Sequence, residues 1–200
     1  MLFRSRFVLS FLCFLPILTS CSANYEEDVQ KSYKIYVKSQ NPKLIESIKV
    51  LSNKFNDDLG IDALEVVNSE KDANSKISFI KGLRENHGKL GLGQWILTTV
   101  NEGRGVLPAN RPLKKTLIYS MDLEFDEENF LNKSSDILEG RDETDNYQHL
   151  YHLFCHEVGH GLQMDHDDES HSVMYKSIPD SYAFAPEYDY FFNEARLFFE

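Results

Sequence analysis

The stretch "HEVGHGLQMDH", residues 156–166, places three histidines and a glutamate close together near the end of the chain. Side chains at positions i and i+4 of a helix lie on one face, one turn apart, so His156 and His160 can direct their imidazole nitrogens at a common point. Glu157 lies about 100° around the same helix, near enough to reach a water molecule held at that point. The spacing predicts a metal site with a general base beside it.

A catalytic zinc ion needs three protein ligands and an open fourth position for water. His166, six residues beyond His160, is the candidate for the third ligand. Zinc would polarise the water and the scissile carbonyl, while Glu157 would take the proton and deliver it to the leaving amine. With 7 histidines in 200 residues, the expected number of chance H-E-x-x-H matches is only about 0.02. An acidic third ligand, Asp165 or Glu169, is the alternative to His166.

Two further histidines precede this motif. His149 and His152 continue the same helical stripe one and two turns earlier. A helix that reaches a metal ion at His156 has moved away from it at these positions. We therefore expect packing or capping roles for both residues.

The motif carries a family resemblance. The pattern H-E-x-x-H-x-x-x-x-x-H of residues 156–166, followed by "SVMY" at residues 172–175, resembles the metzincin metallopeptidases, and the matrixins among them most closely. The resemblance implies that the three histidines bind one catalytic zinc ion and that Glu157 is the general base. It also implies that Met174 lies beneath the metal as an apolar floor.

Three positions depart from the family pattern. Gln163 stands where the family has a glycine with left-handed backbone, a conformation that costs other residues on the order of 1 kcal/mol. Either Gln163 accepts this strain or Gly161 relocates the bend. Asp167, after the third histidine, is either a buried hydrogen-bonded carboxylate or a solvated surface residue. Lys176 replaces the proline that usually follows the Met-Tyr pair.

The resemblance also suggests where a substrate binds. In the family, an edge strand beside the zinc pairs antiparallel with an extended peptide, and the best match is "GLGQWILTTV", residues 91–100. Backbone pairing gives affinity, and side-chain pockets set preference. We expect Gly93 and Trp95 to contact substrate, with Tyr175 in the pocket wall. An interior strand is the alternative, which the apolar run of this segment would also suit.

The other elements follow from periodicity and turn signals. Alternating apolar residues predict strands at 33–38, 62–68, 75–81, 90–100 and 115–125. Helical spacing predicts helices at 41–60, 146–163 and 186–199. A loop rich in Gly, Pro and Asn spans 101–114, and a polar connection spans 127–145. This order, also that of a matrixin domain, predicts one α+β domain over 33–200, with helices packed on a mixed, twisted five-stranded sheet.

The N-terminus has the composition of an export signal. Residues 1–20 carry two arginines and then an apolar run too short to span a bilayer comfortably. "LTSC", residues 18–21, resembles the lipobox of bacterial lipoproteins, which implies cleavage before Cys21 and acylation of that residue; an ordinary signal is the alternative. Acyl chains would hold the protein on a membrane without a spanning helix. Residues 21–32 would then form the lipidated N-terminus and a linker, and the protein would reside at the outer membrane or surface of a bacterium.

Charge and cysteine content limit the partners. The formal net charge is −11, and loss of the two leader arginines lowers it to about −13. Such a surface repels nucleic acid, so we expect no nucleic-acid partner and mildly favour cationic substrates. Cys155 alone would remain in the folded domain, which excludes an intramolecular disulfide.

The sequence therefore predicts a zinc-dependent endopeptidase that acts on protein or peptide substrates. The alternative is a non-catalytic zinc-binding lipoprotein, serving as an adhesin or structural module. Glu157 separates the two, because a site that only binds metal needs no base. A structural Ca²⁺ is possible, although no motif for one is evident.

Overall fold

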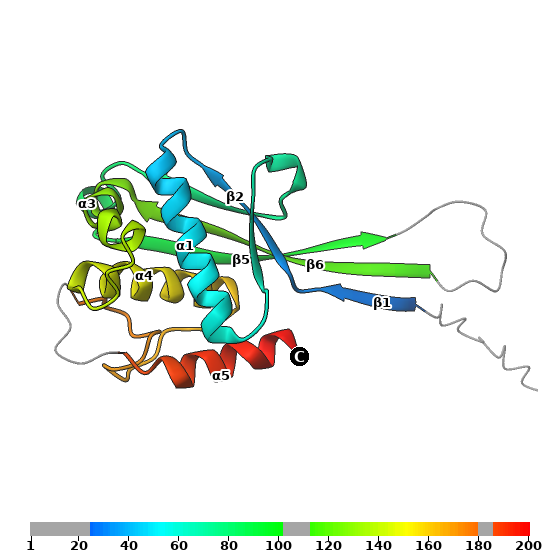
Figure 1. Cartoon of the computed structure of the whole chain (residues 1–200). Helices are drawn as coiled ribbons and strands as arrows, with labels where there is room; N and C mark the ends of the chain where they lie inside the picture. Colours follow the sequence, from blue (N-terminus) through cyan, green and yellow to red (C-terminus); the bar gives the residue numbers. More distant parts are fainter. Residues whose placement is uncertain (1–24, 102–112, 180–185) are drawn as a thin grey trace, which may run out of the picture.

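A mostly parallel sheet forms the framework of the molecule. The computed structural model describes residues 25–101, 113–179 and 186–200 (Figure 1). The elements in chain order are β1 (Tyr25–Gln30), β2 (Tyr33–Lys38), α1 (Pro42–Leu59), β3 (Leu64–Val67), the 3-10 turn η1 (Glu70–Asp72), β4 (Ser75–Ile80), α2 (Leu83–His87), β5 (Gly91–Asn101), β6 (Leu113–Asp126), α3 (Glu127–Leu138), α4 (Asp145–Gly161) and α5 (Tyr188–Phe199). They form one α+β domain, as the sequence predicts.

The sheet has six strands rather than the five expected. Its order is β1-β6-β4-β2-β3 with all these neighbours parallel, and β5 pairs antiparallel with β6. The sixth strand, β1, falls in the segment predicted as a linker. Its sequence "YEEDVQ" is largely polar, so no apolar alternation indicates a strand. The segment forms a strand because it pairs with β6, in register from Tyr25↔Leu113 to Gln30↔Ile118.

Strand β5 is an edge strand, as we favoured from the sequence. It runs alongside β6 from the pair Gly91↔Phe125 to the pair Asn101↔Lys115, and among the described residues β6 is its only partner. Together with β1, the far halves of β5 and β6 extend beyond the body of the domain (Figure 1). The near half of β5 lies against α4 and therefore borders the segment that carries His156, Glu157 and His160.

Helix α3 is the main element that the sequence pattern missed. It occupies most of the connection predicted to be polar and irregular. Asp126 caps its N-terminus by accepting a hydrogen bond from the Asn129 N–H at 2.9 Å. Phe130 and Ile137, two turns apart, are buried on one face. A single apolar stripe in a polar sequence is enough for a helix when the rest of the domain supplies the surface it packs against.

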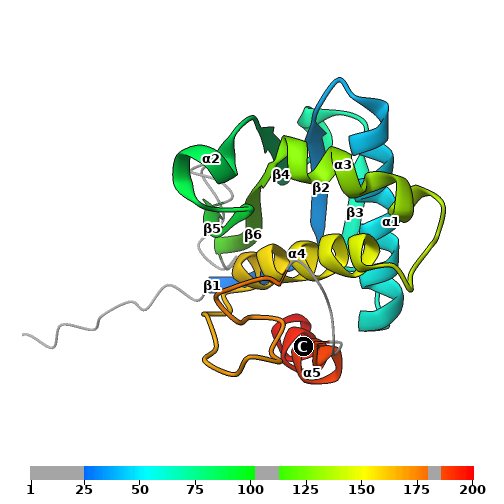
Figure 2. The same cartoon turned by 90° about the vertical axis from the view of Figure 1, so that its left-hand side faces the viewer.

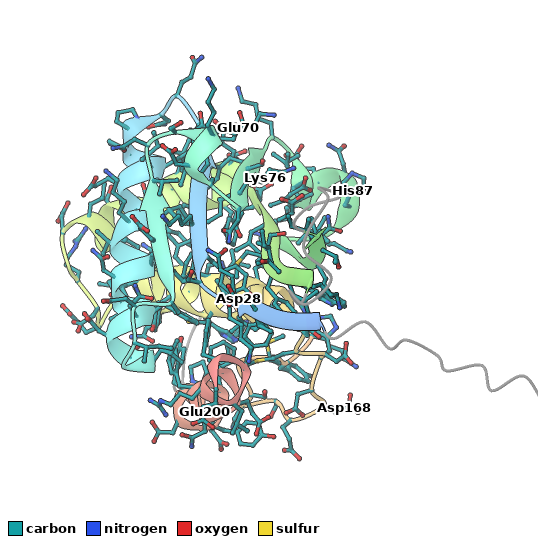
Figure 3. All side chains as sticks on the ribbon, turned by 90° about the vertical axis from the view of Figure 1, so that its right-hand side faces the viewer. Asp28, Glu70, Lys76, His87, Asp168 and Glu200 are labelled. Atoms are coloured by element: carbon teal, nitrogen blue, oxygen red, sulfur yellow. The ribbon has the colours of Figure 1, made fainter. Side chains whose placement is uncertain are left out.

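Helix α4 lies in the centre of the domain, packed between the sheet and the other helices (Figure 2). Its Phe154 is fully buried and contacts Phe55 of α1 and Phe125 of β6, with ring centroids 6.3 and 6.4 Å apart. Phe192 of α5 closes the same aromatic cluster against Phe55 at 5.3 Å. The opposite view shows strands in front of α4, with Glu70 of η1 and Glu200 after α5 at opposite ends (Figure 3). His156 and His160 are thus mounted on a helix that is buried along most of its length.

Candidate metal centre

The three predicted ligands come together at the C-terminal end of α4. His156 is buried, His160 half-buried and His166 exposed. Their ring centroids are 4.8 Å apart for His156 and His160, 5.3 Å for His156 and His166, and 4.7 Å for His160 and His166. One nitrogen from each lies within 4.8 Å of the others, and no other group of His, Cys, Asp or Glu in the described segments could hold a metal ion in this way. These residues could therefore hold one ion.

Backbone carbonyls set the orientation of the two helical histidines. His156 donates from Nδ1 to the Val173 oxygen at 2.9 Å, and His160 donates from Nδ1 to the Met164 oxygen at 2.9 Å. A carbonyl only accepts, so both rings carry their proton on Nδ1 and leave Nε2 unprotonated for a ligand. Burial lowers the pKa of His156 to about 4, although its bond to Val173 opposes the shift. At neutral pH both rings are thus in the form that binds metals.

Gln163 makes the turn that brings His166 back to the helix. Its φ is 68°, the only positive value for a non-glycine residue in the described part of the chain. The Met164 N–H donates to the Gly159 oxygen at 2.9 Å across this turn, which is the pattern of a left-handed helix C-cap. Of the two alternatives, Gln163 accepts the strain. Gly161 remains helical and allows close packing, because a Cβ there would lie 2.9 Å from Met121 Cβ.

The residues around His166 have other roles than metal binding. Asp165 and Glu169, the alternative third ligands, are exposed and do not belong to the group of converging side chains. Asp167 lies between the two predicted states: it is half-buried, and its Oδ1 accepts the Glu169 N–H at 2.8 Å. Its own N–H donates to the Met174 oxygen at 2.9 Å, which ties the third-ligand loop to the methionine segment.

Met174 is buried directly beneath α4. A Cβ placed on Gly159 would lie only 2.4 Å from Met174 Sδ, so glycine at this position lets the thioether approach the helix backbone one residue before His160. The Ser172 hydroxyl accepts the Met174 N–H at 3.1 Å and fixes the turn. An apolar floor under the metal site is compatible with this position and remains a prediction.

Glu157 faces the same space as the histidines. It is buried, lines one cleft together with all three ligands, and its Oε2 has no hydrogen-bond partner among the described residues. A Cβ on Gly91 would lie 2.4 Å from Glu157 Oε1, and one on Gly93 would lie 2.3 Å from the Glu157 carbonyl oxygen. Only glycines at these positions let β5 approach α4 so closely. Burial raises the pKa of Glu157 to about 8, against the lowering effect of the nearby Lys89 charge.

The cleft has a volume of about 590 Å³. It is lined by the start of β5 with the residues before it, by α4, by His166 and by residues 176–178. Gly93 lines it, and its contact with substrate stays a prediction. Trp95 and Tyr175 do not: Trp95 is 46% exposed further along β5, and Tyr175 is half-buried beside Asp167. Contact with a longer substrate remains a prediction for these two.

Sequence reasoning missed three basic residues of the cleft, Arg84, Lys89 and Lys176. Lys176 was visible only as a departure from the family pattern, not as a cleft residue. Lys89 directly precedes the edge strand in the sequence, which is the one signal that could have indicated its position. Arg84 lies on the short helix α2, which no hydrophobic periodicity in the sequence predicts.

His149 and His152 have the packing role that we expected. His149 donates from Nδ1 to the Pro179 oxygen at 3.0 Å and accepts a bond at Nε2 from the Asn129 amide at 3.2 Å. His152 donates from Nε2 to the Val173 oxygen at 3.1 Å. Both are buried, and they hold the segment after the third ligand against the helix.

No protein-family model matches this chain, and no curated protein matches it either. The predicted signal of residues 1–20 and the predicted lipidation at Cys21 lie outside the described residues. Within the described part, no helix has the length and apolar character needed to cross a membrane. Cys155 is buried and not in a disulfide.

Proposed function

We propose that this protein is a zinc-dependent endopeptidase of the metzincin type. The observation that carries the proposal is the pairing of a buried, unpartnered carboxylate with three converging imidazoles in one open cleft. A structural histidine cluster would need no such carboxylate, because an unsatisfied buried acid is costly unless a ligand completes it. A water held by a metal ion at the three imidazoles would supply the hydrogen-bond partner that Glu157 lacks among the described residues.

The donor set suits zinc. Neutral imidazoles are common ligands of this ion, and three of them leave the fourth position open. Nitrogens bound at about 2.0 Å in a tetrahedron lie about 3.3 Å apart, and the Nε2 atoms of His160 and His166 are 3.2 Å apart. His156, whose ligand nitrogen lies within 4.8 Å of both, would complete the set. Zinc at this point would lower the pKa of a bound water and polarise the substrate carbonyl.

The chain itself would supply the remaining chemistry. Glu157 would accept the proton of the attacking water and transfer it to the leaving amine. Burial raises the pKa of Glu157 to about 8 without a bound cation; a zinc ion beside it would oppose this shift and favour the carboxylate form that acts as a base. The carbonyls of Val173 and Met164 would hold two ligand rings in place throughout.

The cleft is suited to an extended polypeptide. Strand β5 borders it with an edge that no described strand occupies. An extended chain adding to this edge would place its backbone across the site with little demand on sequence. We therefore propose proteins or peptides as substrates. We further propose that Cys21 carries the lipid anchor that holds the domain at a bacterial membrane or surface.

The direct test compares the zinc-loaded domain with its Glu157→Ala variant on an unstructured protein such as casein. We expect cleavage by the wild type, at least a hundredfold slower cleavage by the variant, and stoichiometric zinc in both. If both bind zinc and neither cleaves, the chain is a zinc-binding module instead. In parallel, His166→Ala should lose stoichiometric zinc; retention of the metal would show that His166 is not an essential ligand.

A further inference from the structure

The charge of the cleft is opposite to that of the chain as a whole. The formal net charge of the protein is −11. Yet the residues that line the cleft include three cations, Arg84, Lys89 and Lys176, and only one carboxylate, the proposed base Glu157. Local charge in a concave site acts on a ligand more strongly than distant surface charge, because salt screens the latter within about 10 Å.

The two lysines come from different segments of the chain. Lys89 lies two residues before β5 and lines the cleft together with Glu157 and His160. Lys176 lies on the segment after Met174 and lines the same cleft. Both side chains are exposed, and neither forms an ion pair with a described residue. They are therefore available to a ligand.

The nearest acid in the sequence to the third candidate ligand lies outside the cleft. Asp165, next to His166, is exposed and does not line the cleft. Arg84 is anchored at its backbone N–H by Asp126, at 3.0 Å, so the start of α2 is held in place beside Lys89. A peptide in the cleft thus meets cations from two separate segments of the chain.

We infer that the cleft selects peptides that carry aspartate or glutamate next to the scissile bond, with Lys89 and Lys176 as the residues that set this preference. The inference rests on the proposed peptidase function and names its substrate class. It reverses the mild preference for cationic substrates that the overall charge suggests. Substrate carboxylates would pair with the lysine ammonium groups, while both lysines would repel basic side chains of a substrate.

The experiment compares three peptides that differ only beside the scissile bond, with Asp and Glu, with Asn and Gln, or with Lys. The zinc-loaded enzymes are wild type, Lys89→Gln, Lys176→Gln and the double variant. Lys71→Gln is the matched control, since Lys71 is an exposed lysine on η1 that does not line the cleft. We expect kcat/KM for the acidic peptide to exceed that for its amide counterpart by about tenfold in the wild type, each lysine contributing about threefold.

The double variant should lose this ratio, Lys71→Gln should keep it, and about 0.5 M salt should reduce it in the wild type. An equal rate for acidic and amide peptides, or a ratio that survives in the double variant, would overturn the inference while leaving the peptidase function intact.

A binding measurement separates the two hypotheses. The zinc-loaded Glu157→Gln variant, with and without the two lysine substitutions, is titrated with fluorescent forms of the same peptides. If the acidic peptide binds more tightly than the other two, and only when both lysines are present, the inference is supported even without cleavage. In that case only the proposed peptidase function fails. Equal binding of all three peptides would count against the inference whatever the activity.

Discussion

Helix α4 carries four histidines that are buried or half-buried, and its two halves use them differently. In the first half, His149 and His152 bind neighbouring groups and hold the following chain in place. In the second half, His156 and His160 bind carbonyls of the same following chain but also face the open cleft. All four lie on one continuous stripe, so residue type and helical position alone do not separate them.

The difference lies in which nitrogen makes the structural bond. His156 and His160 donate from Nδ1, near the helix, and their outer nitrogen Nε2 remains directed at the site. His152 donates from its outer nitrogen, Nε2, to Val173, and both nitrogens of His149 are bonded. In the two candidate ligands a backbone carbonyl binds the inner nitrogen and the outer nitrogen is left for a metal ion, whereas in His149 and His152 the outer nitrogen is already bonded within the protein.

The largest expected effect tests this contrast by metal content. His156→Asn should lose stoichiometric zinc, because it removes the buried ligand, whereas His149→Asn should retain it. The measurement is the metal content of the purified variants by mass spectrometry after dialysis. Equal loss of zinc from both variants, with both still folded by circular dichroism, would mean that the two halves of α4 are not distinct in function.

The next effect concerns the pH dependence of stability in metal-free protein. Burial, as the largest cause, lowers the pKa of His152 from 6.5 to about 4. Between pH 6.5 and 4 the unfolded chain therefore binds a proton at His152 that the folded chain does not bind. The stability from neutral His152 is fully present above pH 6.5 and is lost as the pH falls through 4. The full contribution is about 3 kcal/mol.

We expect His152→Leu to flatten the fall in the free energy of unfolding between pH 6.5 and 4, measured by urea denaturation. His156, whose pKa is also lowered to about 4, should behave alike in metal-free protein. Added zinc should make the free energy of unfolding fall more steeply with decreasing pH in the His152→Leu variant, because protons displace the metal from His156. The His156→Leu variant should show no such effect. An unchanged slope in metal-free His152→Leu would contradict the burial of a neutral ring.

A smaller effect tests the carbonyl that the two halves share. Val173 accepts from His152 at 3.1 Å and from His156 at 2.9 Å. Removal of the first bond by His152→Leu leaves the second, so the orientation of His156 should loosen only in part. We expect zinc affinity to fall by at most about tenfold, measured by competition with a chelator. A loss as complete as that in His156→Asn would mean that His152 is itself part of the site.

The smallest effect concerns the turn between the second and third ligands. Gln163 has a left-handed backbone, with φ 68°, and glycine there would remove strain of about 1 kcal/mol but add entropy to the unfolded chain. We therefore expect Gln163→Gly to raise the free energy of unfolding by about 0.5 kcal/mol, with unchanged zinc stoichiometry. A decrease in thermal stability would indicate that the Gln163 side chain contributes more than its backbone costs.

The sequence by itself determined the candidate ligands and most of the framework. The spacing of His156, Glu157 and His160 requires only that the segment be helical, and its apolar periodicity ensures that it is. Helix α1 was equally readable, because Asn41 caps it and Gly60 ends it with φ 82°. These features are local, so a one-dimensional pattern contains them.

Tertiary structure decided what depends on partners distant in the sequence. Strand β1 exists because β6 pairs with it, and α3 is stable because its narrow apolar stripe meets a core that the pattern does not show. The same is true of the site: Val173 selects the tautomer of His156, and Gly91 and Gly93 bring β5 against Glu157. Lys89 and Lys176 line one cleft only because folding brings the residues before β5 and the segment after Met174 next to α4. A residue's type follows from the chain, but its protonation, exposure and surrounding charge follow from contacts that only folding creates.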